Sequence, residues 1–180
     1  VTDEQRKKAK QANFGIIYGI TTYGLAQRMG IENGEARQLI DDYFRTFPKV
    51  QAYMEEAKEQ AREKGYAETM FRRRRYLPDI TSRNGTVRGF AERNAINAPI
   101  QGSEADIIKI AMIRIWRRFK YENIRSKMIL QVHDELNFSV YPDEVEKVGQ
   151  IVIEEMQKAC ELNVPLVADA GWGDNWLEAH

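Results

Sequence analysis

Residues 2–19 carry start and stop signals for a single helix, and no other segment of the chain restricts the fold as strongly. Thr2 followed by Gln5 fits a capping box, in which each side chain accepts a hydrogen bond from the other residue's backbone N–H. Gly19 stands where a glycine commonly ends a helix, because glycine enters the left-handed backbone region without a steric penalty. These signals predict a helix bounded by Thr2 and Gly19.

One face of this helix combines cations with aromatic rings. Arg6, Lys10, Phe14 and Tyr18 stand four residues apart, so each side chain is rotated by about 40° from the one before it. At ~1.5 Å per residue, the distance from Arg6 to Tyr18 is about 18 Å along the helix axis. The sequence therefore predicts one continuous stripe, cationic at its start and aromatic at its end.

That stripe permits two interpretations. A nucleoside triphosphate could lie along it, with phosphates on Arg6 and Lys10 near the positive end of the helix dipole and the sugar and base on Phe14 and Tyr18. Alternatively, an ordinary amphipathic helix would have solvated cations and aromatic residues in the core. The spacing alone does not decide between them.

Composition limits the classes of protein that the chain can belong to. Its 180 residues, 43% hydrophobic and 30% charged, suffice for one domain or a large part of one. Lys plus Arg and Asp plus Glu both total 27, which disfavours a purely electrostatic nucleic-acid binder. Cys160 is the only cysteine, so disulfide frameworks and cysteine-rich zinc sites are excluded.

We find no apolar run long enough for a bilayer and no secretory leader. A start at Val1 without Met leads us to expect a piece of a longer protein.

Periodicity and breaking residues predict a mostly helical chain with short strands. Helices are expected at residues 21–30, 33–46, 48–64, 90–98, 103–119 and about 142–161, with Pro99 ending one helix and Ser103 capping the next. Alternating residues predict strands at 66–70, 75–77, 128–132, 136–140 and 165–170. The expected fold class is α+β, a mostly helical segment followed by a small antiparallel sheet packed by helices.

Arginines are concentrated in residues 72–93. Four consecutive arginines at 72–75 are followed by Arg83, Arg88 and Arg93, and only Asp79 and Glu92 oppose them. A solvated loop explains this local charge, and so does contact with a phosphate backbone. Within the same region, Arg93, Asn97 and Gln101 are again four apart, although Pro99 should bend the path.

The side chains of Arg93, Asn97 and Gln101 are suited to hydrogen bonds with base pairs. Arg, Asn and Gln can donate hydrogen bonds to the minor-groove acceptors that every correct pair presents, so such contacts would test pairing geometry and not sequence. Polar residues that satisfy backbone groups at a helix end are the other interpretation.

Two carboxylates, Asp134 and Glu135, occupy the predicted tip of the second hairpin. Acidic residues are common in turns, but Gln131 and His133 add polar groups to an otherwise apolar strand end. Carboxylate oxygens are ligands that Mg²⁺ prefers. One hairpin supplies too few of them, so a two-metal site would need a carboxylate from elsewhere.

These features, in this order, resemble the C-terminal part of family A DNA polymerases, the family of bacterial DNA polymerase I. Six residues of the first helix are similar to the family's nucleotide-binding motif B: Arg6, Lys10, Phe14, Gly15, Tyr18 and Gly19. Residues 131–135 resemble its palm motif C, and residues 72–80 and 97–102 resemble further family segments. The resemblance covers residues 1–180 and implies a fragment of a right-hand polymerase fold, with a fingers segment at 1–92 and the C-terminal part of the palm at 93–180.

The resemblance also implies roles for the first helix. Arg6 and Lys10 would bind the triphosphate of the incoming dNTP, and Lys10 would donate a proton to the departing pyrophosphate. Phe14 would pack on the sugar and base; in this family, Phe at that place accompanies rejection of dideoxynucleotides. Tyr18 would lie beside the nascent base pair.

Further implied roles concern the metals and the DNA. Asp134 would be a ligand of two Mg²⁺ ions, and Glu135 would support it in catalysis. Four residues would contact primer and template near the growing end: Arg93, Asn97, Gln101 and His133. The implied reaction is attack of the primer 3′-hydroxyl on the α-phosphate, with the two metal ions stabilising the attacking and leaving oxygens.

The resemblance places other parts of such an enzyme upstream of these residues. We do not find the family's motif A, whose aspartate bridges both metals and whose glutamate discriminates against ribose, nor a thumb or an exonuclease domain. We therefore expect the 180 residues alone to be inactive and, with apolar surface exposed, to self-associate. Primer–template DNA and dNTP are the expected partners. The expected location is the bacterial cytoplasm, at the nucleoid, in replication and repair and without membrane contact.

Two other classes remain open. A non-enzymatic nucleic-acid-binding module would use the arginine-rich residues and bind DNA in a salt-sensitive way, regardless of nucleotide or Mg²⁺. A metal-dependent phosphohydrolase would use His133, Asp134 and Glu135. It would need more ligands, and the chain has only two histidines, so this class is the weaker of the two.

Overall fold

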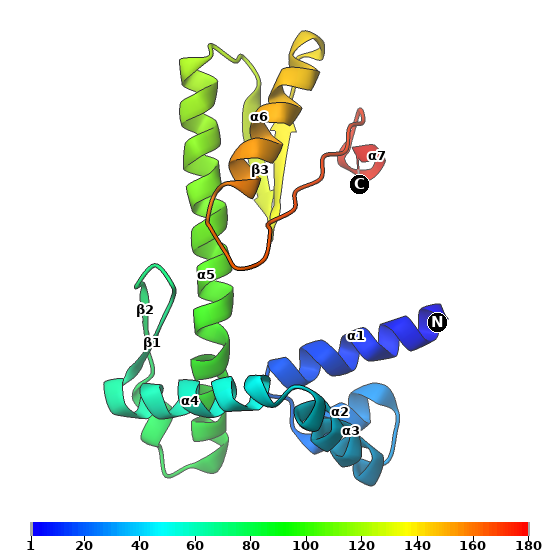
Figure 1. Ribbon diagram of the computed structural model, residues 1–180, viewed down its shortest axis with the longest axis vertical. Coiled ribbons are helices and arrows are strands. Elements are labelled where there is room, and N and C mark those ends of the chain that lie inside the picture. The colour runs from blue at the N-terminus through cyan, green and yellow to red at the C-terminus, as the bar shows by residue number, and fades with distance from the viewer. Residues whose placement is uncertain (1, 180) are drawn as a thin grey trace. The chain divides into compact units, whose positions relative to one another are not determined.

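The computed structural model describes residues 2–179, and the chain divides into two compact units between Gly102 and Ser103. The elements of the first unit (Figure 1) are α1 (Asp3–Ile17), α2 (Thr22–Met29), α3 (Asn33–Thr46), α4 (Pro48–Lys64), β1 (Tyr66–Glu68), β2 (Arg74–Tyr76), the 3₁₀ helix η1 (Pro78–Thr81) and the first part of α5 (Gly85–Tyr121). The second unit holds the rest of α5, β3 (Lys127–Val132), β4 (Glu135–Ser139), the 3₁₀ helix η2 (Pro142–Glu144), α6 (Val145–Gln157) and α7 (Trp176–Ala179).

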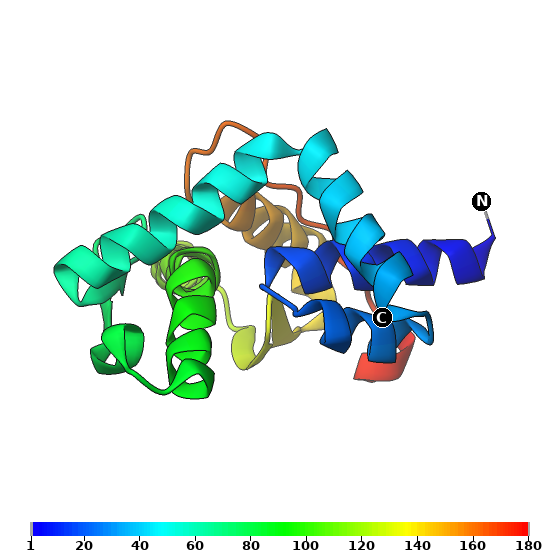
Figure 2. The ribbon, with the colours of Figure 1, turned by 90° about the horizontal axis from the view of Figure 1, so that it is seen from below.

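Helices dominate, and the strands form two separate antiparallel hairpins, β1–β2 and β3–β4. The expected α+β class is therefore confirmed. Local signals set most helix boundaries as predicted: Thr21 caps α2, Gly30 ends it in a left-handed conformation, and Gly65 ends α4 in the same way. Figure 2 shows the bend between α3 and α4, where Phe47 ends one helix and Pro48 begins the next.

The predicted break at Pro99 is wrong, because α5 continues through it and Ser103 lies inside the helix. Proline lacks an N–H, so the carbonyl four residues earlier loses its helical partner. Neighbouring elements hold this stretch in place. The hydroxyl of Tyr53 donates to the carbonyl of Ile96 at 2.9 Å, and the guanidinium of Arg73 donates to the carbonyl of Gly102 at 2.9 Å. Tertiary contacts thus outweigh the local proline signal.

A bulge in β3 corrects the expected strand pattern. Met128 pairs with Phe138, but the next pair is Leu130 with Asn137, which leaves Ile129 without a partner. One extra residue reverses the alternation of faces, so Leu130 lies on the opposite face from Met128. Phe138 packs against the core of the second unit, whereas Leu130 is 55% exposed. The predicted alternation along residues 128–132 therefore fails at the bulge.

The end of the chain also departs from expectation. Residues 165–170 form no strand, because neither described hairpin pairs with them and alternation without a partner does not make a strand. Helix α6 ends at Gln157, earlier than the predicted 161, and Pro142 begins η2 and not α6 itself. Within residues 2–179, no helix is long and apolar enough to cross a membrane.

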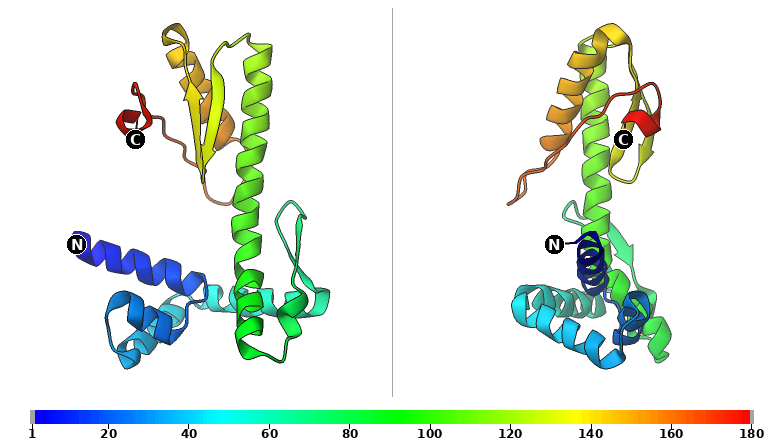
Figure 3. Two further views of the ribbon diagram at one scale, coloured as in Figure 1. Left: turned by 180° about the vertical axis from the view of Figure 1, so that it is seen from behind. Right: turned by 90° about the vertical axis from the view of Figure 1, so that its right-hand side faces the viewer.

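Each unit has its own buried apolar residues. In the first unit, one cluster joins α1, α2 and α3: Ile16, Leu25, Ala26 and Ala36. A second cluster packs α4, the β1–β2 hairpin and η1 on α5: Ala61, Ala67, Leu77, Ile80, Ala91, Ala95 and Ala98. In the second unit α5 packs on α6 (Figure 3): Ile115, Phe119, Val148, Ile151 and Val152. The core-facing side of α1 is therefore the side that carries Ile16.

Candidate functional site

Both ends of α1 are fixed by hydrogen bonds that the sequence predicted. The hydroxyl of Thr2 accepts from the backbone N–H of Gln5 at 3.2 Å, and the side chain of Gln5 accepts from the N–H of Thr2 at 2.9 Å. At the other end Gly19 has φ +75°, its N–H donates to the carbonyl of Ile16, and the next N–H donates to that of Gly15. This pair of bonds is a Schellman motif, which ends the helix sharply.

The stripe on α1 is continuous; Arg6, Lys10 and Phe14 are exposed, and Tyr18 is half-buried. The ammonium of Lys10 lies 5.9 Å from the centre of the Phe14 ring, which lies 6.1 Å from the Tyr18 ring at an interplanar angle of 29°. Phe14 is 45% exposed, while Ile16 is buried. Within residues 2–179, Arg6 and Lys10 make no ion pair, in contrast to Lys8, which pairs with Glu4 at 3.1 Å. Phe14 is thus not a core residue and Tyr18 is only partly covered, which favours the ligand-binding interpretation of this face.

Two contacts fix the position of α1 in the first unit. The hydroxyl of Tyr43 on α3 donates to the side-chain oxygen of Asn13 at 2.8 Å. At Gly19, a Cβ would lie 3.2 Å from Cγ of Arg93, so the aliphatic part of that arginine packs directly on the end of α1. The structure therefore brings the α1 stripe and the arginine predicted to contact DNA into one neighbourhood. Nothing in the sequence pointed to Tyr43, since its partner is 30 positions away.

Arg93, Asn97 and Gln101 share one face of α5, as the spacing predicted. The guanidinium carbon of Arg93 lies 5.9 Å from the centre of the Phe90 ring, and Gln101 is exposed. The side-chain oxygen of Asn97 is buried and has no hydrogen-bond partner among the described residues. A buried acceptor without a partner is unfavourable, so a donor from a bound molecule would stabilise it.

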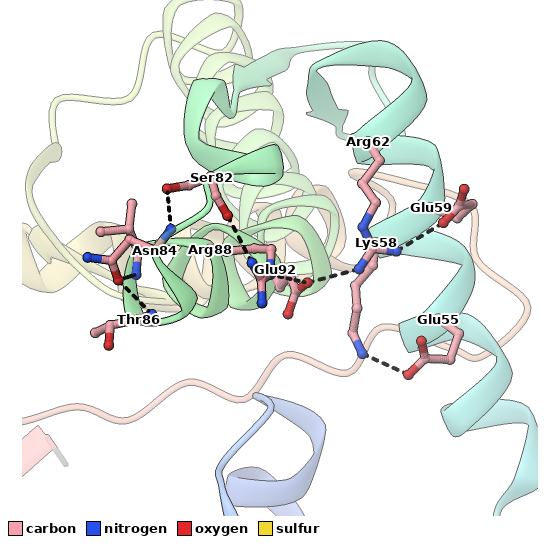
Figure 4. A network of polar contacts seen from close by, with 10 residues as sticks. Glu55, Lys58, Glu59, Arg62, Ser82, Asn84, Thr86, Arg88 and Glu92 are labelled. Carbon is pink, nitrogen blue, oxygen red and sulfur yellow. Dashed lines mark hydrogen bonds and ion pairs between the residues drawn. The ribbon is translucent and has the colours of Figure 1, made fainter.

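Several arginines of residues 72–93 have structural partners. Arg74 pairs with Glu68 at 3.1 Å, and Arg88 donates to the carbonyl of Ser82 and lies 3.9 Å from Glu92, which also binds Arg62 at 2.9 Å (Figure 4). The β1–β2 hairpin that carries Arg74 runs alongside α5 (Figure 3). In the described chain Arg75 and Arg83 make no ion pair. The phosphate-contact interpretation therefore applies to a smaller set of arginines than the sequence offered.

The carboxylates predicted to bind metal lie in the second unit, at the tip of the β3–β4 hairpin. Val132 pairs with Glu135, so His133 and Asp134 form a two-residue loop in which His133 has φ +55°. Both loop residues are exposed, and the amide of Gln131 donates to the carbonyl of His133 at 3.0 Å. Two-residue hairpin loops commonly need a positive φ, and histidine adopts this region more readily than most residues, so the turn itself accounts for this conformation.

The carboxylate oxygens at this tip are ligands that suit Mg²⁺, but there are too few of them to complete a metal site. Asp134 is exposed and makes no hydrogen bond or ion pair with another described residue, so its oxygens can serve as ligands. Among residues 2–179, no three His, Cys, Asp or Glu side chains are grouped closely enough to hold a metal ion. Asp134 thus fits as one ligand of a site that needs others.

The open end of the same hairpin is closed by Glu144. Its carboxylate accepts from the N–H and hydroxyl of Ser126, at 2.9 and 2.6 Å, and from the N–H of Arg125 at 3.0 Å. The hydroxyl of Ser126 in turn accepts from the N–H of Tyr141 at 3.1 Å. These hydrogen bonds, the one from the Ser126 hydroxyl above all, lower the pKa of Glu144 to about 2. Sequence patterns gave no indication of this cluster.

Comparison with known proteins identifies the family of the chain. The model of DNA polymerase family A matches residues 1–178. DNA polymerase I of Bacillus caldotenax is 51% identical over 179 residues, and that of Streptococcus pneumoniae serotype 4 is 50% identical over 179 residues. Each match covers 99% of this chain and 20% of the relative. The chain belongs to DNA polymerase family A.

A solved structure shows the same fold. The POL domain of Pol1 from M. smegmatis, in complex with DNA primer-template and dNTP, superposes with a TM-score of 0.96 at 46% sequence identity. The superposition covers 99% of this chain and 32% of that one. The fold is therefore that of part of a polymerase POL domain, and the chain spans about one fifth of the length of the curated relatives that it matches.

Proposed function

We propose that this chain forms part of a DNA-directed DNA polymerase, which extends a primer on a template by transferring deoxynucleotides from dNTP. The stripe of α1 carries this proposal, because Arg6, Lys10, Phe14 and Tyr18 offer cations and rings in the order that a nucleoside triphosphate requires. Membership of DNA polymerase family A supports it. Residues 1–92 would belong to the fingers and residues 93–180 to the palm.

In the reaction, the primer 3′-oxygen bonds to the α-phosphorus of dNTP, the bond from that phosphorus to the bridging oxygen of the pyrophosphate breaks, and the hydroxyl proton passes to solvent water. Arg6 and Lys10 bind the triphosphate and offset its charge, and Lys10 gives a proton to the pyrophosphate. Phe14 packs on the sugar and base, where a phenylalanine accompanies rejection of dideoxynucleotides, and Tyr18 lies beside the new base pair. Because phosphoryl transfer depends on position and charge, the rigidly capped α1 suits this role.

Four residues bind the primer and template near the growing end: Arg93, Asn97, Gln101 and His133. Arg93 lies against the end of α1, where it would link the nascent pair to the duplex behind it. The unpartnered side-chain oxygen of Asn97 accepts a hydrogen bond from the bound DNA or from an ordered water. The substrate complex named for the M. smegmatis polymerase, with primer-template and dNTP, supports this assignment of partners.

Asp134 is the metal ligand in this proposal, and Glu135 supports it. Two Mg²⁺ ions, when bound, would stabilise the attacking and leaving oxygens. Since the described carboxylates do not complete a metal site, residues 1–180 alone do not polymerise in this account. Apolar side chains such as Leu177, 88% exposed, would then promote self-association of the isolated polypeptide. DNA replication and repair at the bacterial nucleoid is the corresponding cellular role.

Replacing Asp134 tests the proposal in the full-length protein that carries this chain. Asp134→Ala is expected to lower primer extension by about 10²-fold or more while primer–template binding persists, because a ligand of the reacting centre is lost. Asp169→Ala, an exposed carboxylate of the same unit, is the control and should retain activity. Unchanged extension by Asp134→Ala would contradict the proposal. A wild-type protein that binds DNA without regard to nucleotide and Mg²⁺ and extends nothing would support a binding module instead.

A further inference from the structure

A cavity of about 230 Å³ lies in the first unit, behind the last turn of α1. Helices α1, α3, α4 and α5 all contribute to it. Six of its lining residues are apolar: Ile16, Ile20, Ile40, Phe44, Met54 and Ile96. Apolar pockets with a few polar groups are the usual form of small-molecule sites. No side chain assigned above to nucleotide, DNA or metal lines this cavity, although Gly19, part of the motif B resemblance, does.

The charged side chains that line the cavity are already paired. Glu55 binds Lys58 at 2.7 Å, and Glu92 binds Arg62 at 2.9 Å (Figure 4). The side chain of Lys58 is only 19% exposed, so breaking its ion pair would leave a poorly solvated charge. A charged ligand would have to disrupt one of these pairs or remain uncompensated. The electrostatics therefore favour an uncharged ligand.

One uncharged polar group remains available at the cavity. The side chain of Gln51 lines it and makes no hydrogen bond with another described residue. An amide both donates and accepts, so it can bind a hydroxyl or a ring N–H. Size sets the other limit: an apolar cavity of about 150 Å³ admits benzene, so this one has room for a somewhat larger ring system.

We propose that this cavity binds an uncharged aromatic compound of one or two rings with a single hydrogen-bonding group. The ring packs among Ile20, Ile40 and Phe44, and the polar group meets Gln51. Because Ile16 and Gly19 form one wall, an occupant would restrain the end of α1. Any effect on nucleotide use would rest on the function proposed above, but binding itself does not depend on it.

Titration of indole into the full-length protein, followed by ligand-observed NMR, tests the proposal without catalysis. Indole should bind saturably with a Kd on the order of 1 mM. Ile40→Phe places a ring of the protein where the ligand ring would pack, beside Ile20 and Phe44, and should weaken binding at least about tenfold. Leu39→Phe introduces the same side chain at the neighbouring residue of α3, which does not line the cavity, and should change the Kd by less than about twofold. Thermal unfolding of both variants checks that each is folded.

Absence of saturable binding, or equal binding by wild type and Ile40→Phe, would overturn the assignment. The charge preference has its own test with three ligands of nearly equal size. Benzyl alcohol should bind more tightly than benzoate and benzylammonium, and Gln51→Leu should reduce that advantage. Tighter binding of either ion would show that the cavity is not selective for uncharged compounds.

Discussion

Asn13 and Tyr43 share a hydrogen bond of 2.8 Å that holds α1, the helix proposed to bind the nucleotide, against α3. Asn13 lies next to Phe14 in sequence, so a change in this bond would alter the presentation of the whole stripe. A hydrogen bond of this kind contributes about 0.5–1.5 kcal/mol, enough to matter for a helix that must stay in position.

Removing the Tyr43 hydroxyl should affect nucleotide binding and little else. Tyr43→Phe is expected to raise KM for dNTP about two- to tenfold, with a smaller change in kcat. Tyr53→Phe is the matched control, because it also loses one hydrogen bond but at the carbonyl of Ile96. Steady-state incorporation of one nucleotide measures both variants. If the two raise KM equally, Tyr43 has no special positioning role.

Glu144 should make the second unit sensitive to acid. Its pKa falls from an ordinary value of 4.5 to about 2, so the folded state binds the proton more weakly than the unfolded state does. The stability that this carboxylate contributes is present above pH 4.5 and is lost as the pH falls to about 2. Urea unfolding between pH 7 and 2 measures this loss.

Glu144→Gln should lower the urea midpoint at pH 7 and flatten its dependence on pH over that window. Glu146→Gln is the matched control, since Glu146 is exposed and makes no ion pair with another described residue. A Glu144→Gln variant with the pH dependence of wild type would show that the carboxylate does not hold the hairpin closed in this way.

At the level of elements, Gly102 allows the β1–β2 hairpin to pack on α5. A Cβ at this position would lie 2.6 Å from the side-chain methyl of Thr69, which real structures do not tolerate. The same hairpin donates from Arg73 to the carbonyl of Gly102 at 2.9 Å. The glycine is thus required by a tertiary contact, although it lies within a helix.

Gly102→Ala should therefore destabilise the protein, against the usual preference of helices for alanine. Overpacking costs about 1–3 kcal/mol, and a contact as short as 2.6 Å puts the cost toward the upper part of that range, above the gain of about 1 kcal/mol from helix propensity. Thr69→Ser removes the methyl but keeps the hydroxyl that accepts from Arg73 N–H at 3.2 Å, so the same glycine substitution should become neutral or stabilising in that background. Denaturant unfolding of the four proteins forms a double-mutant cycle. A stabilising Gly102→Ala in the wild-type background would refute the contact.

Sequence patterns predicted the elements whose signals are local. Thr2 caps the start of α1, and Gly19 and Gly30 terminate α1 and α2, as expected, because helix caps depend on a few neighbouring residues. Pro99 predicted a break that did not occur, since packing and side-chain donors from other elements hold α5 together. The bulge at Ile129 was not visible either, because it depends on pairing with β4.

In the candidate site too, local features could be predicted from the sequence and tertiary contacts could not. Regular spacing was enough to place Arg6, Lys10 and Phe14 on one face, because they belong to one helix. The hydrogen bond from Tyr43 and the packing of Arg93 on Gly19 join distant parts of the chain, and no pattern in the sequence encodes them locally.

At the scale of the whole molecule, the residues proposed to bind the nucleotide and the residue proposed to bind the metals lie in different compact units. The first holds the groups assigned to the nucleotide, and the second holds Asp134, assigned to the metals. Since the chain spans about one fifth of its curated relatives, activity belongs to the full-length protein in this account. Experiments on function therefore use variants of that protein.

Single-nucleotide incorporation by the full-length polymerase tests most directly whether the α1 stripe binds the incoming nucleotide. Lys10→Ala removes a charged contact worth about 1.5–3 kcal/mol and should lower kcat/KM for dNTP about 10- to 150-fold, with primer–template affinity unchanged. Lys8→Ala, on the same helix but paired with Glu4, should stay within about twofold of wild type. Equal effects of the two substitutions, or no effect of Lys10→Ala, would contradict the assignment of this face to the nucleotide.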